Sequence, residues 1–158
     1  MFVFSISKKR IRLTAIIVLL ILLFVILLSL NYKTVHVSAN PNPSQKLPTI
    51  EDKIAYISNY GYEVDAEPFE IQEMIVPDTF DETLEKYNTL QKSQGFDLSL
   101  FCGKRIKRWS FRITNDPNST EEHPILVNLY LYNQKVIAGD VASTKLDGNM
   151  HALQENNS

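Results

Sequence analysis

RWSFRIT at residues 108–114 and ILVNLYLYNQKVIAGDVA at residues 125–142 are the two stretches of sequence that decide the fold of this chain. In the first stretch, Trp, Phe and Ile alternate with polar residues, and this period of two is typical of a half-buried β-strand. Asn133 and Gln134 divide the second stretch and predict a tight turn between two strands, because Asn tolerates a positive φ. Gly139 is expected at a bulge or at a close-packing position. The three expected strands span residues 108–114, 125–132 and 135–142.

Upstream of these strands, apolar residues recur with a helical period. Thr49 can cap a helix whose isoleucines lie three or four positions apart, and Gly61 supplies the end of this helix. Residues 69–76 are rich in β-favouring residues and are closed by Pro77. This pattern predicts a strand and is compatible with a place at a sheet edge.

A second helix is expected between residues 69–76 and the Trp-containing strand. Asp78 or Thr79 can cap this helix, which runs to about Gln94 and ends at Gly95. The resulting order α-β-α-β-β-β predicts an α+β domain of two layers, with both helices on one face of a twisted antiparallel sheet. The strand at 69–76 is free to join either edge of that sheet.

The N-terminal segment is the most apolar part of the chain. Residues 13–30, LTAIIVLLILLFVILLSL, carry no charge and follow four basic residues between positions 8 and 12. This length and apolarity predict a single membrane-spanning helix. The basic flank keeps the N-terminus cytoplasmic, so everything after Leu30 is expected to be extracytoplasmic. The alternative is a secretory signal, with cleavage after Ala39 and a secreted chain.

The remaining boundaries follow from composition. Residues 31–48 contain several Asn and Pro and few large apolar residues, which predicts an extended linker. The segment that follows is long enough for one modest core and no second domain. The expected organisation is a basic cytoplasmic segment (1–12), a transmembrane anchor (13–30), a linker (31–48), an extracytoplasmic α+β domain (49–153) and a disordered tail (154–158).

Charge and cysteine content narrow the classes of function. Five of the 16 Lys and Arg residues precede residue 34 and none of the 18 Asp and Glu residues does, so the rest of the chain is acidic. An acidic domain argues against a nucleic-acid partner, which requires a basic footprint. The basic run at residues 104–112 is either a solvated strand face or a basic binding patch. Cys102 is the single cysteine, which excludes an intramolecular disulfide, and is expected to be a small buried residue.

The sequence contains no pattern for metal or cofactor chemistry. His36, His123 and His151 have no second His or Cys at ligand spacing, so no metal site is expected. The five glycines are dispersed and form no phosphate-binding loop, so no cofactor is expected either. A hydrolase would rest on Cys102 or Asp140, but no local motif supports either residue, and no catalytic residue is assigned.

The densest cluster of polar residues surrounds the end of the second helix. Its members are three amides, a tyrosine and a carboxylate: Tyr87, Asn88, Gln91, Gln94 and Asp97. In a structural role, these side chains would cap backbone groups at the corner between the helix and the next strand. In a functional role, they would line a polar groove for a ligand. The sequence leaves both interpretations open, and the five residues are the candidate site.

Three segments occur in an order and spacing that resemble a known family. They are NYGYEV at residues 59–64, YNTLQKSQGFDL at residues 87–98, and VIAGDV at residues 136–141 followed by LDG and MH at residues 146–151. Together they resemble the bacterial domain-of-unknown-function family 4830, over about residues 50–153. Members of that family typically carry an N-terminal apolar segment, and the resemblance implies no activity, cofactor or catalytic residue.

The chain departs from the pattern of that family at two positions. Ala138 stands where the family has glycine, and Ala142 stands where it has cysteine. Any redox role of that cysteine elsewhere in the family would therefore not extend to this chain.

Three functions are compatible with these observations. The first is a non-catalytic, membrane-anchored interaction module of a bacterial envelope, which binds a protein partner or a second copy of itself. The second is a secreted or anchored domain that binds a small ligand or a peptide at the polar corner. The third is an extracytoplasmic hydrolase. The sequence favours the first function, because it requires no catalytic constellation.

Overall fold

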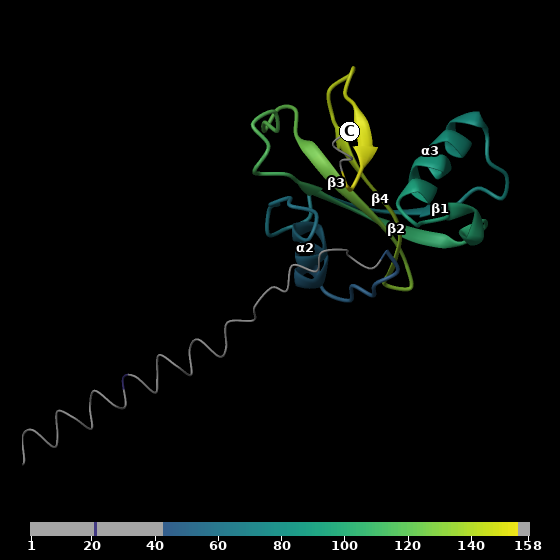
Figure 1. Cartoon of the computed structure of the whole chain (residues 1–158), viewed down its shortest axis with the longest axis horizontal. Coiled ribbons are helices and arrows are strands. Elements are labelled where there is room, and N and C mark those ends of the chain that lie inside the picture. The colour runs from purple at the N-terminus through teal and green to yellow at the C-terminus, as the bar shows by residue number, and fades with distance from the viewer. Residues whose placement is uncertain (1–20, 22–42, 155–158) are drawn as a thin grey trace, which may run out of the picture. The chain divides into compact units, whose positions relative to one another are not determined.

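The strands of the described residues form one antiparallel sheet of order β1-β2-β3-β4-β5 (Figure 1). The structure, a computed structural model, describes residue 21 and residues 43–154. In chain order the elements are α2 (Ile50–Ser58), β1 (Glu70–Ile75), α3 (Glu82–Ser93), the 3-10 helix η1 (Leu98–Phe101), β2 (Arg105–Arg112), β3 (Ile125–Tyr132), β4 (Lys135–Ser143) and β5 (Met150–Ala152). The predicted α+β class is therefore confirmed.

The sheet has one strand more than predicted. The turn at Asn133 and Gln134 is confirmed, with φ angles of 49° and 67°. The strand predicted at 69–76 is confirmed as β1 and takes an edge of the sheet beside β2. The expected total of four strands was wrong because β5 pairs with β4 around Val141 and His151. A strand of three residues is too short to display the alternation from which strands are predicted.

Both helices begin at carboxylate or hydroxyl caps. The Thr49 side chain accepts from the Asp52 N–H and the Asp52 carboxylate accepts from the Thr49 N–H, a reciprocal capping box at the predicted start of α2. α3 begins later than predicted, because its N-cap is Asp81, whose carboxylate accepts from the Leu84 N–H at 2.8 Å. Gly95 ends α3 with a φ of 86°, which glycine adopts without steric cost.

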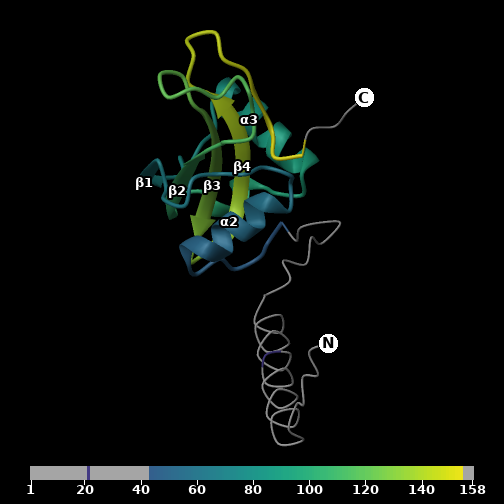
Figure 2. The same ribbon diagram turned by 90° about the vertical axis from the view of Figure 1, so that its left-hand side faces the viewer.

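The two helices lie on opposite faces of the sheet, which corrects the prediction that both cover one face (Figures 1 and 2). Tyr56 of α2 packs in a cluster with Leu129 of β3. Tyr87 of α3 packs in a second cluster with Tyr130 and Ala138, whose side chains project from the other face. The reason is that β3 and β4 are apolar on both faces, so one layer of helix would leave the second face in water.

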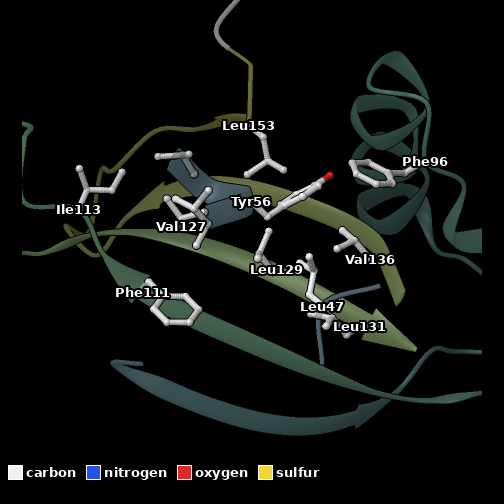
Figure 3. Packing of buried hydrophobic residues seen from close by; sticks show 12 residues of the cluster. Leu47, Tyr56, Phe96, Phe111, Ile113, Val127, Leu129, Leu131, Val136 and Leu153 are labelled. Carbon is white, nitrogen blue, oxygen red and sulfur yellow. The ribbon is translucent and has the colours of Figure 1, made fainter. Parts of the chain in front are cut away.

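The larger core cluster joins α2, three strands and the C-terminal segment (Figure 3). Leu153 is fully buried in this cluster. A Cβ atom on Gly139 would lie 2.5 Å from Leu153 Cδ1, so Gly139 is a close-packing position, one of the two roles predicted for it. The register irregularity between β3 and β4 lies instead at Tyr130 and Leu131.

The folded part begins before residue 49. The Leu47 N–H donates to the Gln134 carbonyl at 2.8 Å, and the Val136 N–H donates to the Gln45 carbonyl at 3.1 Å. Leu47 is also fully buried in the larger core cluster. Residues 45–47, which composition assigned to the linker, therefore cover part of the edge of β4. A lone leucine among polar residues gives no periodic signal, so sequence patterns did not reveal this contact.

Several sequence-based predictions fall outside the described residues. They concern the basic segment 1–12, the anchor 13–30 apart from Ile21, the linker before residue 43, cleavage after Ala39, and the tail after residue 154. Within the described part of the chain, no helix has both the length and the apolarity required to cross a membrane.

Candidate functional site

The predicted polar corner divides into two structural groups. Asn88 Nδ2 donates to Asp97 Oδ1 at 3.1 Å, and Asn88 Oδ1 accepts from the Leu98 N–H at 2.8 Å. Asp97 Oδ1 also accepts from the hydroxyl and the backbone N–H of Ser99, at 2.6 and 3.0 Å. The Ser99 hydroxyl, with further hydrogen bonds and the charge of Lys92, lowers the pKa of Asp97 to about 2. This group closes the corner between α3 and η1.

The second group attaches α3 to the edge of β4. Gln91 Oε1 accepts from the Gly139 N–H at 3.0 Å, and Gln91 Nε2 donates to the Gly139 carbonyl at 3.1 Å. Gln94 Nε2 donates to the same carbonyl at 3.1 Å, and Gln94 Oε1 accepts from the Leu153 N–H at 2.7 Å. The Gln91 amide thus pairs with Gly139 as the peptide group of a neighbouring strand would.

The three amides of the corner therefore serve the backbone of the domain itself. Asn88 and Gln91 are only 1% and 0% exposed, so neither reaches a ligand from solvent. These contacts match the structural role considered for the corner. Asn88, Gln91 and Gln94 are engaged within the domain, so three of the five candidate residues are not free to line a ligand groove.

Tyr87 differs from the amides because it connects a buried polar chain to a groove. The Tyr87 hydroxyl donates to Asp140 Oδ2 at 2.7 Å. Asp140 Oδ1 accepts from Asn128 Nδ2 at 2.7 Å, and Asn128 Oδ1 accepts from the Ser110 hydroxyl at 2.6 Å. Asp140 and Ser110 are each 1% exposed. This hydrogen-bonded chain runs from α3 across β4 and β3 to β2.

Burial dominates the electrostatics of this chain. Burial raises the pKa of Asp140, against hydrogen bonds from Asn128 and Tyr87 and the charge of Arg108, which lower it. Burial, together with the charge of Asp140, raises the pKa of Tyr130 to about 12 and also raises the pKa of Tyr87. Arg108 pairs directly with Glu70 at the surface. Asp140 is therefore a carboxyl group held by neutral donors, and its charged form is disfavoured.

An apolar groove of about 680 Å³ lies between α3, the end of β1 and the face of the sheet that carries Tyr130. We call it the α3 groove. Its lining comes from β1 and the following loop, α3, η1, β2, β3 and β5: Met74, Ile75, Val76, Pro77, Asp81, Thr83, Leu84, Lys86, Tyr87, Leu90, Leu98, Ile106, Tyr130 and Met150.

The lining of the α3 groove is mainly apolar. Its charged side chains, Asp81 and Lys86, are exposed, and Lys86 already pairs with Glu82 at 2.6 Å. The hydroxyl of Tyr87 is engaged by Asp140, which does not itself line the groove. The groove can therefore hold apolar groups, and its lining provides no nucleophile aligned with a base.

A second hollow, of about 420 Å³, lies on the opposite face beside α2. Lys53 is only 3% exposed there, and its Nζ donates to the carbonyls of Leu47 and Thr49, at 2.9 Å each. The same Nζ lies 4.2 Å from the centroid of the Trp109 ring. Burial lowers the pKa of Lys53. These contacts hold the segment before α2 against the sheet.

His36 lies outside the described residues, and the other residues considered for hydrolysis and metal binding do not line the α3 groove: Cys102, His123, Asp140 and His151. Cys102 is partly exposed at the end of η1, which corrects the expectation that it is buried. Asp140 is buried behind Tyr87, and His123 lies in an exposed loop. Among the described residues, no group of three His, Cys, Asp or Glu side chains could hold a metal ion.

Two features of the sequence indicate parts of this site that the predictions above did not include. Asn128 and Asp140 interrupt the apolar interiors of β3 and β4, and they are direct partners in the register of the two strands. Met74 and Ile75 are adjacent apolar residues, which places apolar side chains on both faces of β1. Together, these two features indicate a sheet whose two faces are both covered by other elements.

The fold and its hollows define a small α+β domain with an apolar groove beside α3. The family model of a domain of unknown function, DUF4830, matches residues 56–141, and the chain belongs to that family. This match confirms the resemblance found from the sequence. No curated protein matches this chain, and no solved structure matches it.

Proposed function

We propose that this chain is a membrane-anchored interaction module of a bacterial envelope, and that its extracytoplasmic domain binds an apolar face of a partner polypeptide in the α3 groove. Support for the anchor is the uncharged segment 13–30 behind a basic flank. The observation that supports binding most directly is the mainly apolar lining of the α3 groove.

A polypeptide fits the α3 groove better than an enclosed small molecule does. Met150, which lines the groove, is 50% exposed, so the groove is bordered by an apolar side chain that remains in contact with water. Apolar surface of this kind is removed from water when a partner covers it. Methionine side chains adapt to partners of different shape, and Met74 and Met150 both contribute to the lining.

The charged residues of the α3 groove suit a partner that is amphipathic. Asp81 and Lys86 are exposed, where they can contact the polar face of a helix or strand whose apolar face enters the groove. The volume of the groove also lies in the range of small-molecule sites, so a small apolar ligand is the second candidate.

Binding is tested with the full-length chain in nanodiscs, titrated with a fluorescent amphipathic helical peptide of leucine and lysine and, separately, with a long-chain fatty acid. Met150→Glu places a charge in the α3 groove, whereas Leu146→Glu places the same charge on an exposed apolar residue outside it. We expect the peptide to bind the wild type and Leu146→Glu equally, and Met150→Glu at least about tenfold more weakly. Binding of the fatty acid alone would favour the small-ligand function, and binding of neither probe would contradict both functions.

The location of the domain is tested separately, in intact cells. Leu146 is fully exposed, so a cysteine at this position in a Cys102→Ser background is accessible to reagents. A membrane-impermeant maleimide should label Leu146→Cys in intact cells, with the chain in the membrane fraction. Labelling only after lysis would contradict the extracytoplasmic location, and labelled chain in the medium would indicate cleavage after Ala39.

A further inference from the structure

We infer that the outer edge of β1 is a self-association interface, at which the β1 strands of two copies of this chain pair antiparallel and join two sheets into one. This inference concerns the outer edge of β1, where Ile75 alone of the proposed pairing residues also lines the α3 groove, and it does not depend on the proposed function.

Within the described part of the chain, β4 has a covered outer edge and β1 has an open one. The outer edge of β4 is covered along its length by residues 45–47, by the Gln91 amide at Gly139, and by β5. Among the described residues, no segment pairs with the outer edge of β1. Soluble proteins usually protect such an edge because it pairs readily with another strand.

The backbone of β1 presents a regular set of pairing groups at this edge. The Val76 N–H donates to the Lys104 carbonyl at 3.0 Å, in the same register in which Met74 faces Ile106. Because N–H and C=O groups of antiparallel strands alternate between the two sides, the even-numbered residues of β1 bond to β2. The N–H and C=O groups of Ile71, Glu73 and Ile75 therefore point outward.

The side chains at the same edge are unusually apolar for a strand in water. Phe69, Ile71 and Ile75 are 58%, 48% and 59% exposed. Ile71 and Ile75 lie on the face of the sheet that carries Trp109, which is the partner of Ile71 in β2. Covering these side chains on association would remove apolar surface from water.

One register satisfies the backbone and the side chains together. If Glu73 lies opposite Glu73 of the second copy, then Ile71 lies opposite Ile75 of that copy and Ile75 opposite Ile71. All outward-pointing residues of β1 are then paired, and the isoleucines meet across the interface. A shift by two residues would place Ile71 or Ile75, depending on its direction, opposite Glu73 instead. The contact is isologous and closes as a dimer.

The central carboxylates do not prevent this pairing. Glu73 lies 3.2 Å from Lys107 Nζ and 3.5 Å from Arg105 Nη1, so each copy contributes two cations beside its own carboxylate. The Lys107 hydrogen bond and charge, followed by those of Arg105, lower the pKa of Glu73. The repulsion between two directly opposed glutamates is therefore largely compensated within each copy.

Cysteine crosslinking of the full-length chain in its own membranes tests this register. Single cysteines replace Ile71, Glu73 or Ile75 in a Cys102→Ser background, and the membranes are treated with a mild oxidant or a short bifunctional thiol reagent. Opposed residues in such a pair have Cα atoms about 5.5 Å apart, whereas the two copies of residue 71 would be about 14 Å apart. We expect Glu73→Cys to give severalfold more dimer than Ile71→Cys or Ile75→Cys alone. Coexpressed Ile71→Cys and Ile75→Cys should crosslink to each other.

Three results would overturn the inference. They are equal dimer yields at all three positions, no dimer from Glu73→Cys, or an adduct of Glu73→Cys with a different protein in place of the dimer. A second measurement does not depend on cysteines: the mass of the unmodified chain in detergent should be that of a dimer. The double variant Ile71→Lys/Ile75→Lys should be monomeric with an unchanged circular dichroism spectrum, and a dimeric double variant would contradict the inference.

Discussion

Replacement of Gln91 should weaken the attachment of α3 to β4, because the fully buried Gln91 amide pairs with both backbone groups of Gly139. In Gln91→Ala the Gly139 carbonyl keeps the bond from Gln94, but the Gly139 N–H loses its acceptor. A buried donor without a partner costs about 1–3 kcal/mol. The cavity left by the truncated side chain adds to this, so the free energy of unfolding should fall by about 2–4 kcal/mol.

Two measurements test this prediction. Denaturant unfolding gives the loss of stability, and hydrogen exchange gives the protection of the Gly139 amide, which should be high in the wild type and lost in Gln91→Ala. Gln91→Met keeps the volume but not the bonds, so it should lose the same protection with a smaller loss of stability. Lys92→Ala, at the neighbouring exposed position, should change stability by less than about 0.5 kcal/mol. Unchanged exchange at Gly139 in Gln91→Ala would refute the reasoning.

Four further predictions concern Asp140, Gly139 and Thr49. Asp140→Ala removes the acceptor of both the Tyr87 hydroxyl and the buried Asn128 amide and should cost about 2–5 kcal/mol in denaturant unfolding, whereas Asp140→Asn should cost much less. Because burial raises the pKa of Asp140, wild-type stability should fall as pH rises from the unfolded pKa through the folded one, and Asp140→Asn should lack this fall. Gly139→Ala should cost about 1–3 kcal/mol by overpacking against Leu153, measured by thermal unfolding. Thr49→Ala removes the capping box with Asp52 and should cost about 1 kcal/mol, with increased hydrogen exchange confined to the first turn of α2.

The local structure of the domain could be predicted from the sequence because it depends on short-range chemistry. The turn at Asn133 and Gln134, the cap at Thr49 and the strand at residues 69–76 each carry their own signal within a few residues. The Gly139 packing contact was likewise anticipated as one of two alternatives. None of these features depends on the arrangement of the elements in space.

The arrangement of layers could not be predicted because it depends on which strand faces must be covered. The alternation in β2 indicates one apolar face, that of Trp109 and Phe111. The second face is apolar through Tyr130 and Ala138, which lie in strands that are apolar throughout and show no alternation. The helices were therefore assigned to one face, although each face has its own.

The candidate site could be predicted only in its location. Gln91 and Asn88 form a cluster of polar contacts, as the sequence indicated, but these contacts are internal to the domain. Only Tyr87 of the five predicted residues lines the α3 groove. The other residues of the groove come from segments far apart in sequence, such as Met74 and Met150, and no local pattern relates them.

The most direct test of the account is photo-crosslinking in intact cells that express the full-length chain. A photoreactive phenylalanine analogue replaces Met150, which lines the α3 groove, or, as the control, Leu146, which lies outside it. Both residues are exposed; Leu146 lies in the loop before β5 and Met150 is the first residue of β5. We expect a discrete adduct with another polypeptide at position 150, absent at position 146 and lost when Thr83→Glu introduces a charge at an exposed residue that lines the groove. No adduct at position 150, or the same adduct at both positions, would contradict the proposal that the α3 groove binds a partner polypeptide.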